Sequence, residues 1–251
     1  MTGRYVLFLD DGGVISDNDV RAPQWQRMVG QFFAPILGGS AEAWAEANRV
    51  VITSFFSPGA WEARMNSTPD YWSFERKYNL DWLADMCQLV GVPTPSEEES
   101  VELARRAGAW IVSKVRADFP GAADAIRRLH DAGYILHTAS GESSTDLKGY
   151  LGATGVLDCF GRLYGPDLVN THKSGPDYYE RIFADAGALP TDALVIDDSH
   201  VALSWAVQVG ARTVLVTSKQ RRSEYSEALP KPCLTVGSLA EVSPELLAGI
   251  N

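Results

Sequence analysis

The sequence predicts an α/β protein, in which a doubly wound parallel sheet is interrupted after its first strand by an inserted α-helical domain. The first observation is the continuous apolar run Tyr5–Leu9, which is typical of a parallel strand covered on both faces. The second is a stretch from about residue 17 to 116 that is helical in character. The third is the alternation of strand-like and helical segments after Pro120, which indicates a sheet with helices on both sides.

The inserted region shows helix start and stop signals. Ser40 is a good N-cap for a segment rich in alanine and glutamate. Ser96 is followed by Glu97, Glu98 and Glu99, and acidic residues in a first turn complement the helix dipole. We therefore predict a helical domain at residues 17–116 and an α/β domain formed by residues 1–16 and 117–251.

The rest of the α/β domain follows in order. We expect helices at residues 121–133, 143–155, 174–187 and 200–210. We expect strands at residues 134–138, 161–165, 193–197, 212–217 and 233–237. In open α/β sheets, ligands bind at the carboxyl ends of the strands, so functional residues are sought there.

Composition limits the partners. The chain has 251 residues and a net charge of −10, which disfavours nucleic acid or an anionic membrane as main partner. A small anionic substrate stays compatible, because a pocket can be locally positive. The three scattered cysteines show neither metal-ligand spacing nor a disulfide framework. The apolar N-terminal run is too short for a signal peptide, so we predict a cytoplasmic protein.

Polar residues follow the predicted strands. Asp10 ends the first strand, Thr138 ends the second, and Asp197 and Asp198 end the strand at 193–197. Lys173 precedes the helix that begins near Pro176. Clustered carboxylates repel one another unless a cation is bound or their pKa values are raised. Carboxylate oxygens are the ligands that Mg²⁺ prefers, so we predict a Mg²⁺ site.

Four segments, "FLDDGGVI", "YILHTAS", "THKSGPDYY" and "LVIDDSHVAL", resemble in order the four motifs of the haloacid dehalogenase-like hydrolase superfamily. The resemblance is to the branch with a Rossmann-like core and a helical cap inserted after the first strand. It implies that Asp10 attacks the substrate and forms an aspartyl-phosphate. It also implies that Thr138 and Lys173 are catalytic, that Thr138, Ala139 and Lys173 bind substrate, and that Asp10, Asp198 and Asp197 bind Mg²⁺.

This resemblance predicts a Mg²⁺-dependent phosphatase of small phosphorylated metabolites, with one departure. Phosphatases of the family carry an aspartate two residues after the nucleophile, which protonates the leaving group, whereas this chain has Gly12. Asp11 is expected to face away from Asp10, because successive strand side chains point to opposite faces. The residues left open as replacement acids are Asp17, Asp19, Glu62 and His200, each of which is more often a surface residue.

Three alternatives follow from Gly12. Haloacid dehalogenases of the superfamily lack the second aspartate, but they tend to have uncharged residues where this chain keeps Asp197 and Asp198. Phosphonatases place a small residue at the position of Gly12 and use a cap lysine, for which this chain offers Lys77 and Lys114. The third alternative is a catalytically impaired binding or regulatory protein that keeps Mg²⁺ and phosphate recognition.

Overall fold

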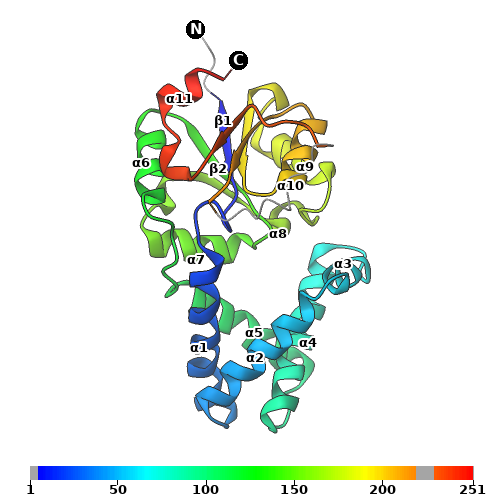
Figure 1. The fold of residues 1–251 in the computed structure, drawn as a ribbon. Helices are drawn as coiled ribbons and strands as arrows, with labels where there is room; N and C mark the ends of the chain where they lie inside the picture. The colour runs from blue at the N-terminus through cyan, green and yellow to red at the C-terminus, as the bar shows by residue number, and fades with distance from the viewer. Residues whose placement is uncertain (1–4, 219–228, 251) are drawn as a thin grey trace. The chain divides into compact units, whose positions relative to one another are not determined.

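The computed structural model describes residues 5–218 and 229–250, and the chain divides into two compact units (Figure 1). One unit is an α/β unit formed by Met1–Asn18 and Arg116–Asn251, and the other is a helical unit formed by Asp19–Val115. The boundaries predicted from the sequence are 16/17 and 116/117.

The α/β unit contains a six-stranded parallel sheet in the order β3-β2-β1-β4-β5-β6. The first strand along the chain is therefore in the middle of the sheet, between β2 and β4. The strands are β1 (Val6–Leu9), β2 (Ile135–Ala139), β3 (Phe160–Tyr164), β4 (Ala193–Asp197), β5 (Arg212–Val216) and β6 (Leu234–Val236). This sheet confirms the predicted fold class.

Both faces of the sheet are covered by apolar cores. On one face, Leu7 and Leu9 of β1 pack with residues of α6 such as Ile126. On the other face, Phe8 packs with residues of α9 and α10, including Phe183 and Leu203. The helices of this unit are α6 (Ala122–Asp131), α7 (Ser144–Thr154), α8 (Pro166–Val169), α9 (Pro176–Ala186), α10 (His200–Gln208) and α11 (Pro244–Ala248). The two shortest, α8 and α11, were not predicted, because so few residues show no helical period.

Two helices of the helical unit begin at the N-caps predicted from the sequence. The side chain of Ser40 accepts a hydrogen bond from the backbone of α2, and Ser96 and Glu99 form a capping box at α5. Its core includes Phe33 and Trp44, whose rings stack with centroids 5.0 Å apart. Its helices are α1 (Asn18–Leu37), α2 (Ala41–Phe55), α3 (Ala60–Asn66), α4 (Tyr71–Val90) and α5 (Glu97–Val112). Among the described residues, no helix combines the length and the apolar character needed to cross a membrane.

Candidate active site

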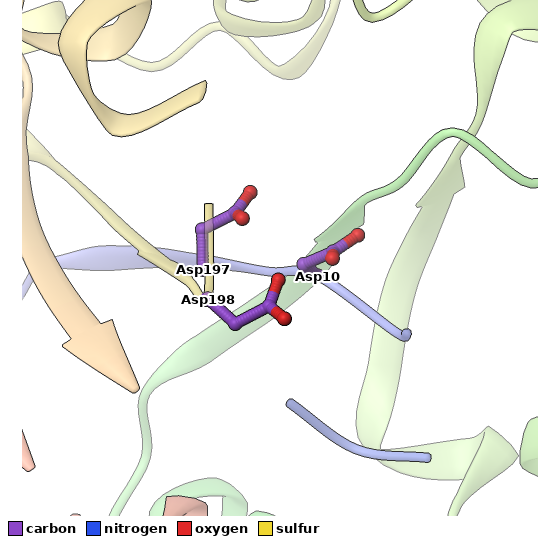
Figure 2. Close-up of side chains that lie close together, drawn as sticks. All are labelled: Asp10, Asp197 and Asp198. Carbon is purple, nitrogen blue, oxygen red and sulfur yellow. The ribbon is translucent and has the colours of Figure 1, made fainter. Parts of the chain in front are cut away.

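Three carboxyl groups meet at the carboxyl ends of β1 and β4 (Figure 2). Asp10 follows β1, Asp197 ends β4, and Asp198 comes next; one oxygen of each lies within 4.8 Å of the others. The two strands are neighbours, and the Asp10 amide donates to the carbonyl of Ile196 at 2.9 Å. Parallel pairing of β1 with β4 therefore brings together residues that are about three quarters of the chain apart.

Lys173 joins this cluster from the loop before α9. Its Nζ lies 3.0 Å from Oδ1 of Asp10 and 2.6 Å from Oδ2 of Asp197, and its side chain is only 9% exposed. Burial lowers the pKa of this ammonium, but the Asp10 and Asp197 carboxylates raise it by more, so that the net pKa is well above its usual value. Lys173 is thus a permanent positive charge beside Asp10.

Asp197 and Asp198, at the end of β4, have different surroundings. In Asp197, Oδ2 accepts from Lys173, and Oδ1 accepts from the backbone amide of Ser199 at 2.7 Å. Both oxygens of Asp197 are thus engaged in orienting the ammonium and the start of α10. Asp198 instead lies against Gly13, on the loop that follows Asp10. This geometry favours Asp198 over Asp197 as a direct metal ligand.

Gly13 is required by this arrangement. Its φ is +85°, a region that side chains disfavour, and a Cβ added there would lie 2.0 Å from Oδ2 of Asp198. Its carbonyl accepts a hydrogen bond from Oγ of Ser218 at 2.9 Å. The loop can therefore pass under the Asp198 carboxylate only because residue 13 has no side chain.

The charge of the cluster fits a divalent cation. The pKa of Asp10 is raised from its ordinary 3.8 to about 8, mainly by burial; Lys173 acts to lower this pKa, and Asp197 and Asp198 act to raise it. With all three carboxyl groups ionised, this group of four side chains would carry two net negative charges, which a bound divalent cation would balance. An oxygen-only donor set with this charge suits Mg²⁺, which Asp10 and Asp198 would hold.

Thr138 and Ala139 are fully buried at the end of β2, where Thr138 pairs with Leu9 of β1. The Thr138 hydroxyl donates to the carbonyl of Tyr164 at 3.1 Å. The role of these two residues in binding substrate stays a prediction, since this hydroxyl is directed at the backbone. The Tyr178 hydroxyl donates to the carbonyls of Ser140 at 3.0 Å and Tyr164 at 3.2 Å. No local sequence pattern reveals this contact of Tyr178.

The residues proposed as replacement acids belong to both units. Asp11 is fully buried, and one of its oxygens accepts from Oγ of Ser16 at 2.9 Å, which agrees with the expectation that it turns away from Asp10. His200 is buried with Nε2 at 2.9 Å from the Pro230 carbonyl. Asp19 and Glu62 belong to the helical unit. Asp17 follows Ser16 in the α/β unit, and its amide donates to the Ala117 carbonyl at 2.7 Å.

Comparison with solved structures shows which proteins share this fold. The L-2-haloacid dehalogenase from Xanthobacter autotrophicus has 16% identity and a TM-score of 0.64, over 99% of this chain and 100% of that one. Another L-2-haloacid dehalogenase has 17% identity and a TM-score of 0.68, over 98% and 100%. A predicted phosphoglycolate phosphatase from Haemophilus somnus 129pt has 16% identity and a TM-score of 0.58, over 96% of each chain. Comparison with curated proteins finds no match.

A family comparison goes further than the fold. The family described as "haloacid dehalogenase-like hydrolase" matches residues 31–210, which is more than half of the chain. The matched range includes Thr138, Lys173, Asp197 and Asp198, and it begins after Asp10. Asp10 is linked to these residues by the geometry above, since it lies beside Lys173 and the two aspartates at the end of β4. The chain therefore belongs to the haloacid dehalogenase-like hydrolase family.

Proposed function

We propose that this hydrolase cleaves a phosphate ester of a small anionic metabolite through an aspartyl-phosphate on Asp10, with Mg²⁺ as cofactor. The observation that carries the proposal is the cluster of Asp10, Asp197 and Asp198, with its carboxylate oxygens within 4.8 Å and Lys173 beside it. A site that attacks a neutral carbon has no need of a third carboxylate, whereas phosphoryl transfer needs a cation beside the nucleophile.

Each residue has a role in the proposed reaction. One oxygen of Asp10 attacks phosphorus, and the ester P–O bond breaks with its electron pair going to the leaving group. Lys173 favours the ionised form of Asp10 and offsets charge on the phosphoryl group, while Asp197 holds Lys173 in place. In the second step, water attacks phosphorus and loses a proton to solvent, and the bond between phosphorus and Asp10 breaks with its electron pair returning to the carboxylate. Inorganic phosphate then departs and Asp10 is regenerated. Bound Mg²⁺ would supply charge neutralisation between the carboxylate and the phosphate.

The test compares an aryl phosphate with an alkyl phosphate, with Mg²⁺ and with a chelator. We expect Mg²⁺-dependent hydrolysis of the aryl ester, because an aryl leaving group departs with little protonation. Asp10→Asn should remove this activity while the protein stays folded, as measured by circular dichroism. Full turnover by Asp10→Asn would exclude the aspartyl-phosphate mechanism, and equal rates with chelator would exclude the metal.

A second candidate is the displacement of halide from carbon by Asp10. It is favoured by Gly12, since a halide leaves without a proton, and by the fold shared with L-2-haloacid dehalogenases. In this reaction Asp10 attacks carbon, halide leaves with the electron pair, and water then cleaves the resulting ester. Asp198 speaks against it, because it adds an anion where the substrate is already a carboxylate. Halide release from a 2-haloacid in the presence of chelator, without phosphatase activity, would select this candidate.

The lysines considered for a phosphonatase mechanism have surroundings that do not activate an amine. Lys77 pairs with Asp81, with Nζ 2.8 Å from Oδ2, and its side chain is 51% exposed. Lys114 is exposed, with Nζ 4.8 Å from the centroid of the Trp110 ring. An amine that forms a Schiff base is usually desolvated or placed beside another cation, and neither lysine is in such an environment. We therefore rank this chemistry below the other two.

A further inference from the structure

The space in front of Gly12 is filled by the side chain of Asn18. A Cβ added to Gly12 would lie 3.0 Å from Nδ2 and 3.3 Å from Oδ1 of Asn18. Gly13 has a positive φ, whereas Gly12 does not, so the backbone at position 12 would accept a residue with a side chain. What occupies the place of a side chain at position 12 is therefore the carboxamide of Asn18.

The loop between the two residues is held tightly enough to fix this contact. The amides of Ile15 and Ser16 donate to the carbonyl of Asp11 at 2.9 and 2.8 Å, and the amide of Gly13 donates to Ser16 at 2.8 Å. Gly12 and Ser16 also form a β-bridge. The chain thus turns back on itself after Asp11, and it brings Asn18, the first residue of α1, against Gly12 within the α/β unit.

The contact between Asn18 and Gly12 lies next to the proposed site along the chain. Gly12 is two residues after Asp10, and its neighbour Gly13 lies against the Asp198 carboxylate. Asp10 is directed at Lys173, and Asp11 is directed at Ser16. The Asn18 carboxamide offers a hydrogen-bond donor and an acceptor, but it gives up no proton in the physiological range.

We propose that Asn18 sets leaving-group specificity by binding the leaving-group oxygen without protonating it, which selects phosphate esters whose leaving group departs as a stable anion. Aryl, enol and acyl phosphates belong to this class, and alkyl phosphates do not. This inference rests on the proposed phosphatase function. In the step concerned, the P–O bond breaks, the oxygen keeps the electron pair, and the Asn18 amide donates to that oxygen.

The test is a series of aryl phosphates with leaving groups of increasing pKa, together with an alkyl phosphate, measured with Mg²⁺. For the wild type, we expect kcat/KM to fall steeply along the series. Asn18→Asp places a carboxyl at the same position, and we expect kcat/KM for the alkyl ester to rise about 10-fold or more, within the usual range of general acid catalysis. The nitrophenyl ester should change little, and the alkyl activity should fall as pH rises and the new carboxyl ionises.

Two controls separate this role from a structural one. Gln208→Glu makes the same change from amide to acid on the exposed end of α10, and it should leave the series unchanged. Asn18→Ala should lower kcat/KM for aryl esters about 3- to 10-fold, as expected for one lost hydrogen bond, with no new pH dependence. Because Asn18 is exposed, these variants should fold as the wild type does.

The outcomes distinguish the inference from the function on which it rests. If the wild type hydrolyses aryl esters and Asn18→Asp shows the same slope and the same pH profile, the role of Asn18 is overturned while the phosphatase stands. If no ester is hydrolysed with Mg²⁺ by any of the variants, the proposed function fails and the role of Asn18 fails with it.

Discussion

At the scale of single residues, the two neighbouring glycines after Asp11 have different reasons to be glycine. Gly13 combines a positive φ with close approach to the Asp198 carboxylate. Gly12 has neither constraint, and in the proposed reaction it leaves position 12 without a side chain that could transfer a proton. One glycine therefore builds the site, and the other changes its chemistry.

Alanine substitutions should separate the two glycines. Gly13→Ala should weaken Mg²⁺ binding about 10-fold or more and remove activity, because its Cβ would displace Asp198. Gly12→Ala requires only a shift of the Asn18 side chain by a few tenths of an ångström, so Mg²⁺ affinity should change less than about 2-fold. Isothermal titration with Mg²⁺ measures both, and equal losses in the two variants would contradict this account of the loop.

The raised pKa of Asp10 predicts a pH-dependent metal affinity. Without metal, the Asp10 carboxyl keeps its proton up to about pH 8, whereas in the unfolded chain it loses the proton near its ordinary pKa of 3.8. Its contribution to stability is therefore present at low pH and is lost as pH rises through about 8. Since Mg²⁺ binds the ionised form, stabilisation by Mg²⁺ should grow from pH 6 to about 8 and then level off.

Thermal melts with Mg²⁺ and with chelator at several pH values measure this effect. In Asp10→Asn, the increase with pH should disappear, because the group that exchanges a proton for the metal is gone. A Mg²⁺-induced shift in Tm that is the same at every pH in the wild type would show that Asp10 does not lose a proton on metal binding.

The glycine at position 12 also leads us to expect slow hydrolysis of the proposed aspartyl-phosphate. The second step needs a base to activate water, and glycine provides none; such assistance is typically worth about 10²–10⁴-fold. With a nitrophenyl ester we expect a rapid burst of nitrophenolate, close to one per active site, followed by slow turnover. Stopped-flow absorbance measures the burst, and linear release from the first turnover would show that hydrolysis of the intermediate is not the slow step.

At the scale of elements, α9 and the loop before it build one side of the site. The loop carries Lys173 to the carboxylates of β1 and β4. Tyr178, in the first turns of the helix, donates to carbonyls at the ends of β2 and β3. The helix thereby ties the ends of four strands to one rigid segment.

Removing the Tyr178 hydroxyl should loosen these strand ends. Tyr178→Phe leaves two buried carbonyls with one donor fewer, so we expect a loss of about 1–2 kcal/mol in the free energy of unfolding. Tyr179→Phe is the matched control, because its buried hydroxyl makes no hydrogen bond within the described residues. Urea unfolding measures both variants, and a larger loss for Tyr179→Phe than for Tyr178→Phe would contradict this view of α9.

At the scale of the whole molecule, the candidate site residues lie in one unit and the inserted helices form the other. The residues assigned to Mg²⁺ and to Asp10 chemistry all belong to the α/β unit, although a helical unit of nearly a hundred residues (Asp19–Val115) is inserted between Asp10 and the rest. The site therefore assembles only when the first strand pairs with β2 and β4, which follow the insertion.

This division predicts a local response to metal. Mg²⁺ alone should slow amide hydrogen exchange in the loop after Asp10 and around Ser199, and it should leave α2 and α4 unchanged, since the proposed ligands all lie outside the helical unit. Exchange followed by mass spectrometry gives this map. Asp198→Asn should remove the protection, and protection of α2 and α4 by Mg²⁺ alone would contradict the assignment.

The sequence by itself determined the order of elements and the residues at the strand ends. Buried parallel strands appear as continuous apolar runs, helix caps as local signals at Ser40 and Ser96, and the motif residues as polar groups directly after a strand. These features are local, so the strands of the sheet, the caps of α2 and α5, and the family were predictable without coordinates.

Only the tertiary structure decided which of these residues share contacts. The engagement of Asp197 with Lys173 and Ser199, the bond from Tyr178 to two strand ends, and the passage of Gly13 under Asp198 all join residues distant in the chain. The Asn18 amide lies against Gly12 because the loop from Asp11 to Ser16 turns back on itself. The hydrophobic pattern of the sequence does not predict that turn. Chemistry at a strand end depends on distances of a few ångströms between separate segments, and such distances are set by how the segments pack.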